Sequence, residues 1–331
     1  VILLFPAIYG NNHTGVYYNL DESLPKDLPS VIANTKLKED YNMNTTHMIL
    51  VDSSVAGSDV KKMSQEIEKV DGVKWVLGLD NLVGSGVPAD MLPESVTGML
   101  KNDKYQLLMV NSTYKVATDK VNKQIEQIDK IMDKYDKGAM LVGEGPLTKD
   151  LINITDTDFK RVSAVSIGIV FVIILLLFKS VTIPVILVGV IEFAIFVNMG
   201  IPFYTGTKLP FVASIVIGTI QLGATVDYAI LMTTRYQRER SRGAGKFDAI
   251  TTAHKFSAQS IIVSALSFFA ATIGVGLYSN IDMISSLCIL MARGALISMV
   301  VVVLILPSLF MVFDKIIVKT SKGFRPTGLK S

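Results

Sequence analysis

The chain of 331 residues is poor in cysteine and in charge. Its single cysteine, Cys288, cannot form an internal disulfide, which excludes a disulfide-stabilised scaffold. Only 18% of the residues are charged, below the roughly 25% that is usual for soluble globular proteins. The net charge of +3 is too small to indicate a nucleic-acid partner. This composition excludes a cytosolic enzyme and a disordered tail.

The sequence also lacks recognisable catalytic and metal-binding motifs. It contains no glycine-rich phosphate loop, Walker motif, Ser-His-Asp set or metal-ligand cluster. The three histidines, His13, His47 and His254, are scattered along the chain. We therefore expect no enzymatic activity, no cofactor, no metal and no ATP-driven pumping, so any energy source has to come from elsewhere.

The few charges are unevenly distributed. Residues 162–234 contain only four charged side chains and residues 256–313 only two, whereas residues 11–161 resemble an ordinary soluble protein. Five apolar segments follow that region, and each is long enough to cross a bilayer, which takes about 20 residues. The predicted spans are Val162–Phe178, Ile183–Phe203, Pro210–Thr234, Phe256–Tyr278 and a fifth within Ile284–Phe313.

Two apolar segments do not have the length of a span. The fifth stretch is too long, so we place Arg293 at the membrane interface as an anchor, followed by the span Gly294–Phe313. Ile284–Ala292 then becomes a short helix along the membrane surface. Residues 1–10 are too short to cross, and we interpret them as the outer end of a truncated transmembrane helix. The alternative is a buried core strand.

The distribution of basic residues predicts the orientation in the cell membrane. Loop 235–255 and the tail at 314–331 are rich in Lys and Arg, whereas loops 204–209 and 279–283 together hold one Lys. Because basic loops stay in the cytoplasm, we expect this loop and the C-terminus to be cytoplasmic. Residues 11–161 then form an extracellular domain, and 162–313 form a five-helix transmembrane domain.

The extracellular domain has a regular order of elements. Strand and helix patterns alternate as βαββαβ, which is the split ferredoxin-like unit. The fold class is therefore a polytopic α-helical membrane protein plus an extracellular α+β ferredoxin-like domain. Residues 87–100 are expected to form a connecting helix, with a mobile substrate-contacting loop as the alternative. The predicted elements are Thr46–Val51, Ser58–Val70, Val73–Leu79, Lys104–Val110, Ala117–Tyr135 and Ala139–Val142.

Asp227 is the sharpest candidate for chemistry. It has apolar residues on both sides and lies roughly 12 Å along the helix from the first basic residue, Arg235. An ionisable group at that depth is costly and is normally functional, so we predict a reversible proton carrier. Tyr228 offers a neighbouring hydroxyl for the relay. The alternative is an Asp that neighbouring hydroxyls satisfy and that serves only packing.

Other polar residues in the spans are candidates for relay or packing support. Glu192 is either a second proton site or a helix–helix hydrogen-bonding group, and Gln221 shares the helix face of Tyr228. Four serines recur on one face of the fourth span. Close packing of small residues is favoured for them over a polar stripe facing Asp227. They are Ser257, Ser260, Ser264 and Ser267.

Two short motifs resemble one transporter family. The run Gly-Ala-Thr-Val-Asp227-Tyr228-Ala-Ile is similar to the signature of MMPL-type transporters of the RND superfamily, as is Arg293-Gly-Ala-Leu leading a span with Leu306-Pro307. The architecture of one helix, a ferredoxin-like porter domain and five helices is also similar. In detail, the chain resembles the C-terminal half of a Gram-positive bacterial member.

The resemblance implies a proton-motive-force-driven exporter of lipids or other hydrophobic molecules. Asp227 and Tyr228 would be its proton relay, with the proton gradient as the energy source. The implied partners are membrane lipids, a hydrophobic substrate and the other half of the transporter, which would carry the second Asp-Tyr pair. The alternatives are a SecDF-like protein-export motor and a membrane-anchored sensor or assembly scaffold.

Overall fold

The computed structural model describes residues 3–19, 23–82, 93–321 and 323–324. Its contacts divide the chain into two compact units. Residues 18–156 form what we call the sheet unit, and residues 1–17 together with 157–331 form the helical unit.

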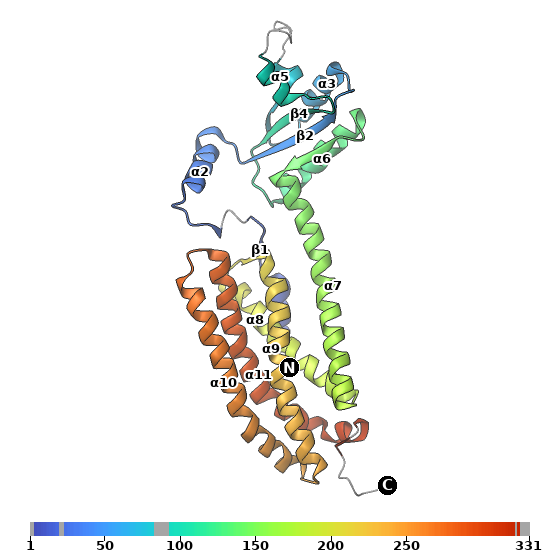
Figure 1. The fold of residues 1–331 in the computed structure, drawn as a ribbon, viewed down its shortest axis with the longest axis vertical. Coiled ribbons are helices and arrows are strands. Elements are labelled where there is room, and N and C mark those ends of the chain that lie inside the picture. Colours follow the sequence, from blue (N-terminus) through green and yellow to red (C-terminus); the bar gives the residue numbers. More distant parts are fainter. Residues whose placement is uncertain (1–2, 20–22, 83–92, 322, 325–331) are drawn as a thin grey trace. The chain divides into compact units, whose positions relative to one another are not determined.

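The sheet unit is built on four antiparallel strands (Figure 1). In chain order they are β2 (Thr45–Asp52), β3 (Val73–Leu77), β4 (Tyr105–Ser112) and β5 (Met140–Gly143), and their order in the sheet is β3-β4-β2-β5. Helix α3 (Gly57–Ile67) connects β2 to β3, and α6 (Asp119–Tyr135) connects β4 to β5. The observed element order is therefore βαββαβ.

One face of this sheet carries the core. Alternate residues of β2, among them Ile49 and Val51, pack against apolar side chains of α3 and α6. The alternation buries one face of the strand because successive side chains point to opposite sides. On the other face, Met48 and its register partner Val142 remain exposed.

The six predicted elements of this unit are present, with small shifts at their ends. α6 begins at Asp119 because the Thr118 side chain accepts a hydrogen bond from the Val121 backbone N–H, which caps the helix. Strand β3 ends at Leu77 because the short helix α4 (Leu79–Leu82) follows directly. Part of the predicted helix 87–100 lies outside the described residues, and α5 (Glu94–Leu100) forms its second half.

Helix α2 (Pro29–Tyr41) was not predicted. Its apolar residues are not concentrated on one face of the helix, and none of its side chains is buried. Without that periodicity the strongest sequence signal of a helix is missing.

His47 is a buried titratable group on the core face of β2. Its Nε2 lies 3.3 Å from Gln124 Oε1 on α6, and its Nδ1 has no hydrogen-bond partner within the described residues. A Cβ atom at Gly145 would come within 2.5 Å of the imidazole, so glycine is required for this packing. Burial lowers the pKa of His47 below its ordinary value.

We expect His47 to make the sheet unit less stable in mild acid. Below about pH 6.5 the unfolded chain binds a proton that the folded, buried imidazole resists binding, so stability falls as the pH falls. Amide hydrogen exchange of β2, measured between about pH 7.5 and 5.5 and corrected for intrinsic rates, should reveal lower protection in acid. His47→Gln should weaken this dependence and His254→Gln should leave it unchanged. Equal slopes for wild type and His47→Gln would contradict the assignment.

In the described part of the chain, five helices are long and apolar enough to cross a membrane, and all but the first turns of α7 belong to the helical unit. Helix α8 contacts α9 and α11, and α10 packs against both α9 and α11 (Figure 1). Short parallel strands β1 (Val16–Tyr17) and β6 (Leu209–Pro210) pair beside them. The five helices are α7 (Glu144–Phe178), α8 (Thr182–Thr205), α9 (Phe211–Ser241), α10 (Lys246–Tyr278) and α11 (Asp282–Thr320).

The predicted surface helix at 284–292 is wrong. α11 is one uninterrupted helix, and Leu290 and Ala292 are buried within the bundle. Arg293 does not end the apolar packing because its guanidinium donates hydrogen bonds to Asn198 on α8. Helices α9 and α10 also extend beyond their predicted spans into the basic segment 235–255.

The N-terminal residues form helix α1 (Leu4–His13), so the alternative of a buried strand is wrong. α1 packs against α8 through two glycines. A Cβ atom at Gly200 would lie 2.8 Å from the Ala7 carbonyl oxygen, and one at Gly10 would lie 2.7 Å from the Gly200 carbonyl oxygen. Such small residues let membrane helices approach closely.

A methyl group at Gly200 should therefore separate α1 from α8. We expect Gly200→Ala to destabilise the protein by about 1–3 kcal/mol, the usual effect of overpacking. Gly189→Ala is a matched control on the same helix, because a Cβ atom there meets nothing within 4 Å. Thermal unfolding of both variants in detergent measures the difference, and equal unfolding midpoints would contradict the close approach.

Candidate functional site

Asp227 lies on an exposed stripe of α9. Thr219 and Gly223, two turns and one turn before it, are also exposed and share its helix face. The Thr219 hydroxyl donates to the Ile215 carbonyl within its own helix, 2.9 Å away. Among the described residues, the Asp227 carboxylate has neither a hydrogen bond nor an ion pair. The neighbouring hydroxyls therefore do not satisfy Asp227 within this part of the chain.

Tyr228 faces the interior of the bundle. It is buried in the largest hydrophobic cluster of the helical unit, which also includes Ala229 and Met232 of the same helix and Val190 of α8. Successive residues of a helix point about 100° apart. The two residues of the predicted relay therefore lie in different environments: the Asp227 carboxylate is exposed and the Tyr228 phenol is buried.

Glu192 lines a cavity of about 390 Å³ between helices α1, α7, α8 and α9. A volume of this order accommodates a small ligand or part of a larger one. Thr219 belongs both to this wall and to the Asp227 stripe, and it lies two helical turns before the acid. The lining residues from the three long helices include Ser163, Ser166, Glu192, Phe196, Gly218 and Thr219.

Gln221 belongs to a buried polar network that joins three helices. Asn198 of α8 donates through Nδ2 to Gln221 Oε1, 2.8 Å away, and to the Leu290 carbonyl of α11 at 3.1 Å. Gln221 Nε2 donates to the Ser298 hydroxyl at 3.1 Å. The Thr225 hydroxyl lies 2.7 Å from that of Ser298. Gln221 therefore holds α8, α9 and α11 together.

Arg293 is attached to the same network. Its Nε donates to Asn198 Oδ1 and its Nη2 to the Asn198 carbonyl oxygen, each at 2.8 Å. The partner of Arg293 is therefore the amide of Asn198 on a neighbouring helix. The sequence had instead predicted that Arg293 anchors the helix at the membrane interface. Through Asn198 the structure brings together Gln221 and Arg293, two of the predicted site residues.

The predicted serine stripe of α10 divides into two environments. Ser257 is buried, and its hydroxyl has no partner within the described residues. Ser260, Ser264 and Ser267 are exposed, and the Ser267 hydroxyl donates back to the Val263 carbonyl at 2.8 Å. Of the four serines, therefore, only Ser257 is closely packed within the described part of the chain.

A buried ion pair between α9 and α11 was not predicted. Arg240 donates to both carboxylate oxygens of Asp314, Nε to Oδ1 at 3.0 Å and Nη2 to Oδ2 at 3.1 Å. The Tyr236 hydroxyl also donates to Asp314, and the Tyr236 ring stacks on Phe310. The sequence showed Arg240 only as part of a basic segment. Because nothing in the spacing links it to Asp314, only the packing of the two helices reveals the pair.

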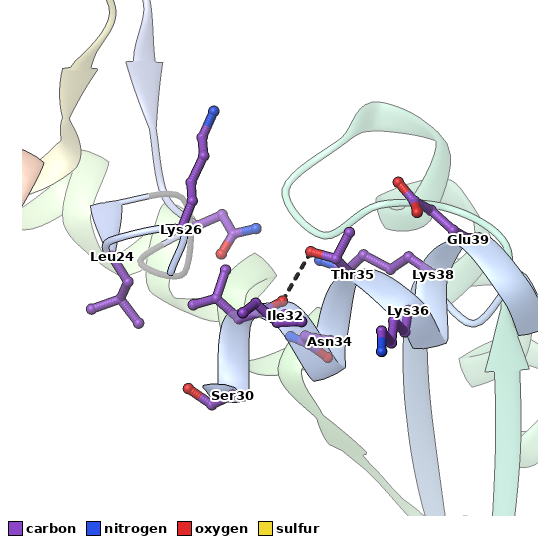
Figure 2. A pocket seen from close by; sticks show the side chains of 11 residues that line it. Leu24, Lys26, Ser30, Ile32, Asn34, Thr35, Lys36, Lys38 and Glu39 are labelled. Atoms are coloured by element: carbon purple, nitrogen blue, oxygen red, sulfur yellow. Dashed lines mark hydrogen bonds between the residues drawn. The ribbon is translucent and has the colours of Figure 1, made fainter. Parts of the chain in front are cut away.

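A hollow of about 910 Å³ lies in the sheet unit, along helix α2 (Figure 2). Lys36 and Lys38 line it from α2, and Leu24 and Lys26 from the segment before the helix. Since α2 buries no side chain, this is a surface hollow rather than an enclosed site. No group of His, Cys, Asp or Glu able to hold a metal ion occurs in the described part of the chain.

The chain is similar to several bacterial membrane proteins. It is 24% identical over 274 residues to the putative membrane protein YdgH of Bacillus subtilis (strain 168), covering 76% of this chain and 28% of YdgH. It is 23% identical over 280 residues to the probable transport protein MmpL1 of Mycobacterium tuberculosis (strain CDC 1551 / Oshkosh), covering 76% and 27%. With the probable transport protein MmpL4 of Mycobacterium leprae (strain TN), it shares 22% identity over 302 residues, covering 87% and 31%.

The chain therefore spans about a third or less of the length of these relatives. Their similarity and the five apolar helices together identify a multi-pass membrane protein. The model of the MMPL family matches residues 23–326, which is nearly all of the sequence. By this match, the chain belongs to the MMPL family.

Proposed function

We propose that the chain is one half of a proton-motive-force-driven exporter of the RND superfamily, which moves lipids or other amphiphilic molecules. The observation that carries this proposal is the exposed Asp227 on α9, with Gly223 and Thr219 on the same face. A carboxylate facing hydrocarbon is costly, whereas a carboxylate facing a second helix bundle can exchange protons through a polar interface. Two relatives carry the name probable transport protein, which supports the same conclusion.

The other half of the transporter would cover the Asp227 face. Small and hydroxyl-bearing residues suit close contact between membrane helices, and Gly223 and Thr219 provide them here. Asp227 would then lie in an interface rather than in lipid, next to the corresponding face of the other half. The Asp227–Tyr228 pair would act as the relay, with Tyr228 transmitting the charge state of Asp227 into the packed bundle.

Proton binding at Asp227 would change the packing of α9. The ionised carboxylate requires polar partners, whereas the protonated acid can lie against apolar groups. Each proton uptake and release therefore favours a different position of α9 against the covering bundle. Because Gly218 and Thr219 of α9 line the cavity with Glu192, this movement would reshape the cavity. We propose that an amphiphile occupies the cavity and that proton-driven reshaping releases it.

The sheet unit would serve as an extracellular porter domain. Its strand order β3-β4-β2-β5 with two connecting helices suits a ferredoxin-like domain. The basic segment 235–255 and the C-terminal tail would be cytoplasmic, because Lys and Arg are retained on that side. Substrate leaving the membrane-spanning bundle would then pass to the porter domain.

The role of Asp227 predicts loss of proton flux on its neutralisation. In proteoliposomes of the full-length transporter with an imposed pH gradient, Asp227→Asn should lower proton flux, read by an internal pH-sensitive dye, by about tenfold or more. Asp227→Glu should retain part of the flux because it keeps a titratable group.

Asp248→Asn is the matched control, since it makes the same chemical change at an exposed acid of the first turn of α10. Proton flux in Asp227→Asn equal to that in Asp248→Asn, at equal reconstitution, would refute the relay assignment.

A further inference from the structure

Arg293 is a charged group on a membrane-spanning helix without a counter-charge in the described residues. Its two hydrogen bonds both go to Asn198, a neutral residue. Within the described chain, no carboxylate pairs with it, in contrast to Arg240, which pairs with Asp314. The desolvation of such a cation is costly, and an anionic partner offsets that cost.

The guanidinium is fixed rather than free to turn. Asn198 Oδ1 accepts from Arg293, while Asn198 Nδ2 donates to Gln221 and to the Leu290 carbonyl, so the amide is held from both ends. Arginine has five N–H groups, and Asn198 accepts only two of them, the one on Nε and one of the two on Nη2. Among the described residues the Nη1 donors have no acceptor. One of them lies parallel to the second N–H of Nη2, and this Nη1–Nη2 edge of the planar guanidinium suits two oxygens of a phosphate or a carboxylate.

Three exposed apolar side chains share the helix face of Arg293. Ile289 lies one turn before it on α11, and Val300 and Leu304 lie two and three turns after it on the same face. All three side chains are exposed. A fixed cation beside an exposed apolar stripe matches a molecule with an anionic headgroup and hydrocarbon chains. An arginine that extends its flexible side chain to the membrane surface needs no neighbouring amide to orient it. Arg293 differs, because Asn198 holds its guanidinium.

We propose that Arg293 and Asn198 form a binding site for the phosphate or carboxylate headgroup of an anionic amphiphile. The Nη1–Nη2 edge of Arg293 binds the headgroup oxygens, and Asn198 orients the guanidinium. The exposed residues Ile289, Val300 and Leu304 accommodate the hydrocarbon chains. The site goes beyond the proposed proton relay, because binding of an amphiphile here requires neither Asp227 nor a proton gradient.

Lipid competition on the full-length protein tests the site. The protein, purified in a neutral detergent, is mixed with equal amounts of phosphatidylglycerol and phosphatidylcholine, and bound lipids are counted by native mass spectrometry. We expect the wild type to prefer phosphatidylglycerol. Arg293→Met should lower that preference about tenfold, as expected for loss of charge-assisted hydrogen bonds.

Two further variants separate geometry from charge. Arg293→Lys keeps the charge but cannot reproduce the planar fork, so it should also lose most of the preference. Arg242→Met is the matched control, because it removes an exposed arginine whose partner is Glu239. It should bind the two lipids as the wild type does.

A measurement on the wild type guards against variants that fail to fold. A photoactivatable phosphatidylglycerol should label the α11 segment 289–304, and unlabelled phosphatidylglycerol should compete with it better than phosphatidylcholine. Absence of a preference in the wild type, a preference that survives in folded Arg293→Met, or labelling confined to other segments would each overturn the proposal. Displacement of the lipid by inorganic phosphate at matched ionic strength would overturn its amphiphile part.

Discussion

The side-chain amide of Asn198 is the contact on which the membrane-spanning bundle depends. Apolar side chains pack almost as well against lipid as against one another, so they determine poorly how helices are arranged in a membrane. Asn198 instead requires specific partners, and it finds them on α9 in Gln221 and on α11 in Leu290 and Arg293. Gly294 leaves the room for this, since a Cβ atom there would lie 2.7 Å from Asn198 Nδ2.

Polar groups of the helical unit fall into two classes according to whether their hydrogen bonds are satisfied within the described chain. Asn198, Gln221 and Ser298 satisfy one another inside and hold the helices in register. Asp227 and Arg293 keep unused hydrogen-bonding capacity within the described chain. Groups of the first class stabilise the scaffold, whereas those of the second are the ones to which we assign a proton, an amphiphile and a second bundle in our proposals.

Elements with a strong repeating pattern were predictable, and those without one were not. The membrane-spanning helices α8 to α11 and the strand β2 follow from composition and spacing, whereas which side chains of β2 are buried is seen only in the structure. Helix α2 was not predicted because its apolar residues are not concentrated on one face of the helix. The break in α11 was predicted wrongly because a lone arginine suggests a membrane interface, and only a neighbouring amide on α8 removes the need for one.

The sequence by itself determined that this is a membrane protein with a separate α+β region, and it singled out Asp227 as an unusual acid. It could do so because hydrophobicity and helical periodicity are local properties of the chain. The tertiary structure decided which polar groups find partners: Asn198 holds Arg293, Asp314 holds Arg240, and Asp227 remains exposed on its helix. Such pairings join residues about 70 to 100 positions apart. Their formation depends on helix packing, which no local pattern specifies.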